Sequence, residues 1–369
     1  MYIRPNDDIQ WGMKLRQFFR YQLRYDARAN EESLMKQYQS GIISDLDCEI
    51  LKFLYENRIA LQSQINDAFP SAGPEIVSDE LWKLLKYHFI NEFMLGDGDP
   101  EIRFQDDALG YYTIDYVGVS LLSHLESDQD IENWNPGMVM MPVQKILKCV
   151  VLTEFHNVAA PLLKDSLVSY NAYRMFSGDP LRIIPKAELI LKGNDGNKLS
   201  ADVPNKAVLV EVADEDDLFY GDAAKLHEKL LRYAQFYEKH HWAKYYMPDP
   251  EIEAELDAAK ADEASAEISK DEVMENPRGL KLKKEDVTSA AEQEAFDKNL
   301  PCGPVLLMIC ENAEVALRVS EQMNDLHIPN YRMTTISLLK NEPETCMMRF
   351  SKEKQKLVRF HSPYFNSRA

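Results

Sequence analysis

The chain has 369 residues and a formal net charge of −19, and 45% of its residues are hydrophobic. This length predicts two domains, and the hydrophobic content predicts packed cores. No stretch approaches the roughly 20 apolar residues of a membrane-spanning helix, which predicts a soluble protein with no membrane partner. The N-terminal residues lack the apolar core of a secretory signal, which predicts a cytoplasmic protein. The acidic balance excludes a uniformly basic nucleic-acid-binding surface, because affinity for phosphate comes from Lys and Arg.

The cysteines and histidines give no sign of a metal site. None of the five cysteines stands in CxxC spacing, and the eight histidines form no HExxH or HxH motif. Structural zinc sites and redox pairs rely on such spacings. The sequence therefore predicts free or buried thiols, no metal and no cofactor.

Residues 1–40 are predicted to form a basic helical arm. Apolar residues from Trp11 to Leu23 follow helical spacing, and four arginines recur at every fourth position, which would place them on one face. One interpretation is an electrostatic contact with nucleic acid, and the alternative is a solvated face or an arm that forms a homodimer. The four arginines are Arg16, Arg20, Arg24 and Arg28.

Residues 41–127 show the pattern of a winged helix-turn-helix. Ser44 can cap a first helix, Leu61 to Phe69 predicts a second, and Val77 to Phe89 a third. A hairpin is expected to follow, with strands at Glu92 to Leu95 and Ile102 to Phe104 around a Gly-Asp-Gly-Asp turn. Residues 111–116 read as a further strand and 117–125 as a closing helix.

An α/β domain is predicted over residues 140–247 and 302–350. Its expected elements are a long helix from Pro142 to Lys164, strands at Leu181 to Leu191 and Ala207 to Val212, and a helix from Asp222 to His240. The apolar run Val305 to Cys310 is typical of a buried parallel strand. A helix at 313–326 and a strand at 333–339 complete this prediction.

Two segments stand apart by charge. Residues 248–300 hold 16 acidic against seven basic residues and few aromatics, which predicts a disordered acidic insertion at 248–301. The C-terminal 21 residues hold six basic residues against the single acid Glu353, so 351–369 is predicted to be a basic tail.

Two glutamates are the best candidates for chemistry. Glu188 and Glu211 lie in the two predicted strands of one hairpin, so that both carboxylates can meet at adjacent strand ends and hold Mg²⁺. A hydrolase would also need a lysine, but Ala213 stands two residues after Glu211, which leaves Lys225 or Lys229 of the next helix as substitutes. The alternative is that both glutamates only make structural hydrogen bonds.

Five segments carry a resemblance to a known family: Leu46–Leu54, Ile184–Leu191, Val208–Val212, Leu230–Tyr233 and Arg332–Thr335. In these segments and in the order of its elements the chain resembles the replication-relaxation family, DNA-associated proteins of bacterial plasmids and conjugative elements. The resemblance implies that the second half is a PD-(D/E)XK, restriction-endonuclease-like core with Pro185, Glu188, Glu211 and Ala213 at the motif positions. This chain has Glu for the first Asp and Ala for the Lys, so the resemblance implies a fold that binds DNA or a partner without cutting.

DNA contacts are predicted at scattered basic residues. Residues 41–125 contain only five basic residues against fifteen acidic ones, so the arginine stripe and the tail would supply most phosphate contacts. Besides the four arginines, the candidates are Lys83, Lys86, Arg103, Lys352, Lys354, Lys356 and Arg359.

Three functions remain open at this point. The first is a non-catalytic accessory protein that binds double-stranded DNA during replication or conjugative transfer of a mobile element. The second is an adaptor whose acidic surface binds a basic partner, such as a relaxase or a replication protein. The third is a divergent metal-dependent nuclease that uses Glu188, Glu211 and a helix lysine.

Overall fold

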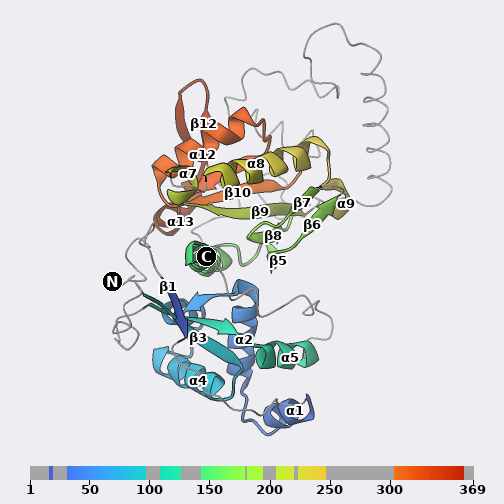
Figure 1. Cartoon of the computed structure of the whole chain (residues 1–369), viewed down its shortest axis with the longest axis vertical. Helices are drawn as coiled ribbons and strands as arrows, with labels where there is room; N and C mark the ends of the chain where they lie inside the picture. Colours follow the sequence, from blue (N-terminus) through green and yellow to red (C-terminus); the bar gives the residue numbers. More distant parts are fainter. Residues whose placement is uncertain are drawn as a thin grey trace.

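The described residues form a mixed α+β protein in two parts, with one long helix between them (Figure 1). None of the helices in these residues combines the length and the hydropathy of a membrane span. The computed structural model describes residues 16–19, 31–96, 109–125, 143–178, 181–193, 205–219, 223–246 and 303–360.

The N-terminal part combines five helices with a four-stranded sheet of order β1-β3-β4-β2. Its elements are β1 (Arg16–Phe19), α1 (Glu31–Gln39), α2 (Asp45–Asn57), β2 (Ala60–Leu61), α3 (Gln62–Ala68), α4 (Pro74–Lys86), β3 (Ile90–Gly96), β4 (Leu109–Ile114) and α5 (Tyr116–Leu125).

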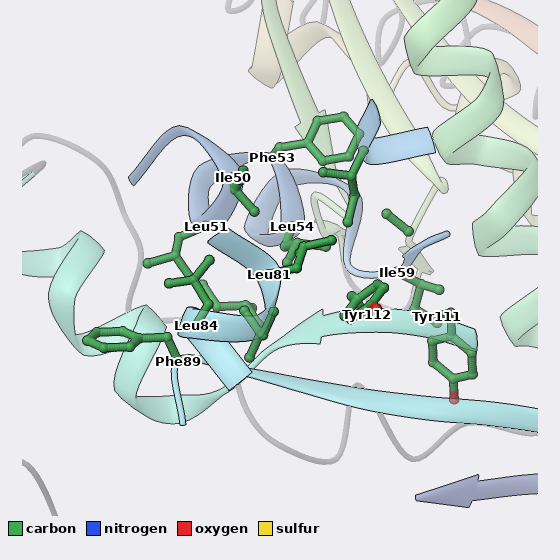
Figure 2. Packing of buried hydrophobic residues seen from close by; sticks show 14 of the residues in the cluster. Ile50, Leu51, Phe53, Leu54, Ile59, Leu81, Leu84, Phe89, Tyr111 and Tyr112 are labelled. Atoms are coloured by element: carbon green, nitrogen blue, oxygen red, sulfur yellow. The ribbon is translucent and has the colours of Figure 1, made fainter. Parts of the chain in front are cut away.

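The three predicted helices of this part are present as α2, α3 and α4. The Ser44 hydroxyl accepts the backbone N–H of Asp47, and the Asp47 carboxylate accepts the N–H of Ser44, so α2 begins with a capping box. Ile50 and Leu54 of α2 then pack against Leu81 of α4, over the aromatic residues of β4 (Figure 2).

One prediction for this part is wrong, and one strand pairing differs from the prediction. Residues 16–19 form strand β1 rather than a helix, because β3 offers an edge whose backbone groups pair antiparallel with Arg16 to Phe19. β3 also takes β4 as its hairpin partner, in a register that stacks Phe93 on Tyr111 at 5.3 Å between ring centroids. The predicted return strand at 102–104 lies outside the described residues, as do residues 20–30.

The C-terminal part has a seven-stranded mixed sheet of order β13-β12-β11-β10-β9-β8-β5 and a separate pair, β6-β7. Its elements are α6 (Val143–Leu162), β5 (Leu167–Ala172), β6 (Phe176–Gly178), β7 (Leu181–Ile183), β8 (Ala187–Leu191), β9 (Lys206–Ala213), α7 (Asp216–Phe219), α8 (Ala223–Glu238), α9 (Ala243–Tyr246), β10 (Val305–Cys310), α12 (Ala313–Asp325), β11 (Tyr331–Thr334), α13 (Ile336–Asn341), the 3₁₀ turn η4 (Pro343–Thr345), β12 (Met347–Ser351) and β13 (Lys356–Phe360).

The predicted alternation of strands and helices is confirmed in outline. β8 and β9 form the expected antiparallel hairpin, and β10 is parallel to both β9 and β11. α8 and α12 cover one face of the sheet, and α6 and α13 cover the other, which gives three layers (Figure 1). The central strands β8, β9, β10 and β11 are therefore largely buried on both faces.

Three boundaries differ from the prediction. Pro185 has no N–H for a ladder, and the predicted strand 181–191 divides there into β7 and β8. The predicted strand from 333 ends at Thr334, because the Thr335 hydroxyl accepts the N–H of Leu338 and begins α13. Residues 356–360 of the predicted tail pair with β12 as strand β13, and residues 361–369 lie outside the described residues, as does 248–301.

Helix α6 is common to both parts. Its first half, including Ile146 and Val150, belongs to the N-terminal core, and its second half, including Leu152 and Phe155, belongs to the core beneath the sheet. The Thr153 hydroxyl donates to the carbonyl of Ile59 at 2.5 Å, which ties the helix to the N-terminal part. One helix thus fixes the two parts relative to each other.

Close packing at Gly118 gives a first prediction. A Cβ built on Gly118 of α5 would lie 2.5 Å from the carbonyl oxygen of Phe89 and 2.8 Å from Cγ1 of Ile114. We expect Gly118→Ala to lower the free energy of unfolding by about 1–3 kcal/mol, as overpacking does in other cores. Urea unfolding measures this change. Ser123→Ala, on the exposed side of α5, should stay within about 0.5 kcal/mol of wild type; an equal loss would contradict the packing argument.

Candidate functional site

The register of β8 and β9 brings the two predicted glutamates to one face of the sheet. Glu188 is paired with Leu209 across the hairpin, and Glu211 follows Leu209 by two positions. Residues two apart on a strand point to the same face. Both glutamates therefore project toward the face covered by α8, near the start of β8 and the end of β9, as the sequence predicts.

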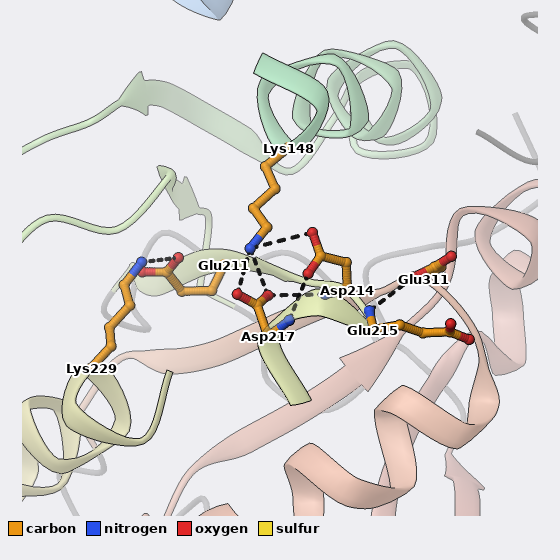
Figure 3. Close-up of polar contacts among 7 residues, drawn as sticks. All are labelled: Lys148, Glu211, Asp214, Glu215, Asp217, Lys229 and Glu311. Carbon is orange, nitrogen blue, oxygen red and sulfur yellow. Dashed lines mark hydrogen bonds and ion pairs between the residues drawn. The ribbon is translucent and has the colours of Figure 1, made fainter. Parts of the chain in front are cut away.

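Glu211 is buried and bound by two residues of α8. The Lys229 ammonium lies 2.5 Å from Oε2, and the Tyr233 hydroxyl donates to Oε1 at 2.7 Å (Figure 3 shows the lysine contact). Lys229 and Tyr233 are four residues apart, so they share one face of the helix. Of the two lysines that the sequence offered, Lys229 makes this contact, and Lys225 is exposed one turn earlier.

Glu188 is fully buried and has a separate set of donors. Nη1 of Arg174 lies 2.9 and 2.7 Å from its two oxygens. The Tyr246 hydroxyl donates to Oε1 at 2.6 Å, and the Asn171 amide donates to Oε2 at 3.1 Å. The two carboxylates thus have the same arrangement, in which each accepts from one cation and one tyrosine.

The pKa shifts indicate that both tyrosines act as hydrogen-bond donors in this network. Burial, aided by the Glu211 charge, raises the pKa of Tyr233 well above its ordinary value, and burial followed by the Glu188 charge does the same for Tyr246. Both phenols therefore stay protonated and donate. Burial lowers the pKa of Lys229, while the Glu211 charge opposes this shift and the Lys186 charge adds to it.

This geometry bears on the metal-binding interpretation. The glutamate oxygens that Mg²⁺ would need already accept from Lys229, Arg174 and the two tyrosines. In the part of the chain that the structure describes, no group of three or more His, Cys, Asp or Glu side chains could hold a metal ion. The arrangement suits a charged structural network better than an open metal centre.

A second charged cluster lies beside this one, where β9 ends. The backbone N–H groups of Asp214 and Asp217 each donate to the other residue's carboxylate at 3.0 Å. The Lys148 ammonium, from α6, lies 2.6 Å from Asp217 Oδ1 and 3.4 Å from Asp214 Oδ2 (Figure 3). Lys148 thus supplies a cation that the acidic run 214–217 lacks in its own sequence, and it ties α6 to the end of β9.

The residues predicted to bind DNA differ in whether they already make ion pairs within the protein. Lys83 is not free on the third helix, because its ammonium lies 2.6 Å from Asp47 and also pairs with Glu80. Arg359 pairs with Glu342. Lys86 is exposed, with its ammonium 5.6 Å from the ring centroid of Tyr87.

The remaining candidates divide into two groups. Arg16 lies on strand β1, so the predicted helical arginine stripe does not begin there, and Arg20, Arg24, Arg28 and Arg103 lie outside the described residues. The other three are exposed at the turn between β12 and β13: Lys352, Lys354 and Lys356.

Sequence reasoning missed most partners of the two glutamates. The four-residue spacing of Lys229 and Tyr233 was a usable signal, since it puts both on the helix face turned toward the strand. Arg174, Tyr246 and Lys148 gave no such signal, because they come from segments 14, 58 and 69 residues away from the carboxylates they contact. Only the tertiary fold brings them together.

Comparison with known proteins gives no assignment: the chain matches no protein-family model, and searches of curated proteins and of solved structures found no similar protein.

The hydroxyl of Tyr233 provides a test of the Glu211 network. Tyr233→Phe removes a donor and leaves a buried carboxylate oxygen without it, so we expect the free energy of unfolding to fall by about 1–3 kcal/mol. Chemical denaturation measures the change. The matched control is Tyr116→Phe, at an exposed tyrosine of α5, which should be neutral. An unchanged Tyr233→Phe protein would show that the network does not stabilise the fold.

The Asp214 cluster predicts a dependence of stability on pH. Burial, with the Asp217 charge adding to it and Lys148 opposing it, raises the pKa of Asp214 to about 7 from 3.8. The folded state therefore binds more protons than the unfolded state between these values, and this group's contribution to stability is lost as pH rises from about 4 to about 7.

We expect Asp214→Asn to flatten this part of the pH profile. Unfolding free energies measured for wild type and variant across pH 4 to 8 should differ in slope below about pH 7 and run parallel above it. Asp325→Asn, at an exposed residue of α12, serves as control and should keep the wild-type slope. Parallel profiles for wild type and Asp214→Asn would contradict the assignment.

Proposed function

We propose that the protein is a non-catalytic, DNA-associated accessory protein that acts in replication or conjugative transfer of a bacterial mobile element. The observation that carries the proposal is the exposed basic turn between β12 and β13. Lys352, Lys354 and Lys356 are exposed there, and none of them makes an ion pair with another described residue. Their charges are available to phosphate oxygens.

The shape of this hairpin supports a role in contacting a duplex. The β12–β13 hairpin extends beyond the helices of the sheet part (Figure 1). Its turn carries three lysines against one glutamate, Glu353, which is a local charge of +2 on a chain of net charge −19. A two-stranded ribbon is a form in which proteins reach DNA grooves and backbones. In this proposal the β12–β13 hairpin makes the phosphate contacts that the sequence analysis predicted for a basic tail.

The proposed domain identities rest on the same resemblance as before. The order α2, α3, α4, β3 and β4 supports a winged helix in the N-terminal part, and Glu188 and Glu211 on neighbouring strands support a restriction-endonuclease-like sheet. The pairing of Glu188 with Arg174 and of Glu211 with Lys229 supports the absence of catalysis.

One observation favours a second function, a divergent metal-dependent nuclease. Lys229 lies 2.5 Å from Glu211 and supplies the lysine that Ala213 does not. Its side chain keeps 35% of its surface exposed, so solvent reaches it. A metal ion that displaced Arg174 from Glu188 would leave Lys229 beside Glu211, as the nuclease requires. The experiment below distinguishes the two functions.

The test is binding of fluorescent double-stranded DNA, followed by anisotropy at several salt concentrations. We expect wild-type binding to weaken with salt, and Lys352→Ala/Lys354→Ala/Lys356→Ala to lower the slope of log K against log salt by about 2–3, because each phosphate contact contributes roughly 0.9. The control has the same change of charge elsewhere on the surface: Lys164→Ala/Lys192→Ala/Lys239→Ala.

Three results would revise the proposal. Wild-type protein that fails to bind at low salt would remove DNA as the partner. Equal slopes for the hairpin and control variants would place the contact elsewhere. Cleavage of plasmid DNA on addition of Mg²⁺ or Mn²⁺, abolished by Glu211→Ala, would establish the nuclease in place of the accessory protein.

A further inference from the structure

The outward face of α4 carries an unusual share of exposed apolar side chains. Nine large hydrophobic residues are exposed among the described residues, and three of them lie on this helix or at its C-cap. Ile76 is 52% exposed, Trp82 54% and Tyr87 39%. The helix is at the periphery of the N-terminal part (Figure 1). Large apolar side chains gathered on one outward helix face are typical of an interaction site.

The amphipathic pattern of α4 explains how these side chains come to share a face. Val77, Leu81 and Leu84 occupy one side of the helix and are buried in the core that Figure 2 shows. At 100° per residue, Ile76, Trp82 and Tyr87 fall on the opposite side. Because Val77, Leu81 and Leu84 are buried in the core, the helix must expose Ile76, Trp82 and Tyr87. A rotation of α4 that buried the second set would remove the first set from the core.

The charges on this face are mainly acidic. Glu75 and Asp79 are exposed between the apolar residues and make no ion pair with another described residue. Lys83 is drawn away toward Asp47 and Glu80. Lys86 is the one exposed cation of this helix within the described part of the chain. We name the set Glu75, Ile76, Asp79, Trp82, Lys86 and Tyr87 the α4 face.

This composition is unsuited to DNA and suited to protein. In a winged helix the third helix is the expected reader of base edges, but free carboxylates at Glu75 and Asp79 would repel phosphate. Exposed Trp and Tyr, by contrast, are the residues most enriched in the energetic centres of protein interfaces. Acidic groups around them favour a partner with the opposite charge.

We propose that the α4 face binds a basic amphipathic segment of a partner protein, with apolar side chains of that segment on Ile76, Trp82 and Tyr87 and its lysines or arginines on Glu75 and Asp79. The proposal goes beyond the DNA-binding function and does not rest on it, because it concerns a different surface from the β12–β13 hairpin. The protein would then hold DNA and a basic protein through two separate surfaces.

The test uses a fluorescein-labelled helical peptide of about 18 residues with leucines on one face and lysines on the other, and the full-length protein. Anisotropy titrations should give saturable binding. Trp82→Ala should weaken it at least about tenfold, as truncation of an interface centre does, and Glu75→Lys/Asp79→Lys should weaken it further. A peptide with glutamate in place of lysine should not bind.

Matched controls separate this surface from general attraction to an acidic protein. Tyr116→Ala removes an exposed aromatic of α5, and Glu238→Lys/Asp325→Lys reverses two exposed acids, one of α8 and one of α12. Both should bind the peptide within about twofold of wild type. Circular dichroism should show that all variants keep the wild-type helix content, so that loss of binding is not loss of fold.

Two outcomes would overturn the proposal. If Glu238→Lys/Asp325→Lys weakened peptide binding as much as Glu75→Lys/Asp79→Lys does, total charge alone would account for the attraction of the peptide. Sedimentation that shows a wild-type dimer and a Trp82→Ala monomer would identify a second copy of this chain, rather than a basic partner, as the occupant of the α4 face.

Discussion

The structure depends on helix α6, which contributes to two hydrophobic cores at once. Half of its buried side chains face α2 and α3, and the other half face the sheet. A helix that is apolar on nearly all sides must be covered on all sides, so neither part is complete without the other. The polar groups of α6 follow the same constraint, since Thr153 donates to Ile59 and Lys148 pairs with Asp217.

Burial of charge is the second organising principle. Glu188, Glu211 and Asp217 are buried, and each lies against a cation that comes from another element. Removal of one of these cations would leave a buried charge unpaired and lower the free energy of unfolding by about 3–5 kcal/mol. The pairs stabilise the end of the sheet where β8 and β9 meet. They also engage the carboxylates that would otherwise be available to a metal ion.

The basic and acidic surfaces of the protein lie on different elements. The β12–β13 turn is basic, and the α4 face is acidic and apolar. Because the two lie on different parts of the molecule (Figure 1), a DNA contact at one would not compete with a protein contact at the other. Helix α6 fixes the two parts, and so the distance between both surfaces is fixed as well. An accessory protein that brings a basic partner to DNA needs such a separation.

Elements that depend on local patterns can be read from the amino-acid sequence. Ser44 and Asp47 specify the start of α2, apolar periodicity specifies α4 and α8, and the run Val305 to Cys310 specifies a buried strand. It also placed Glu188 and Glu211 on one hairpin. Tertiary structure alone decided the rest. The residues 16–19 became a strand because β3 offered an open edge, and Arg174, Tyr246 and Lys148 reached their carboxylates only through the fold. Local patterns carry helix periodicity and caps, but not which distant segment will fill an edge or neutralise a buried charge.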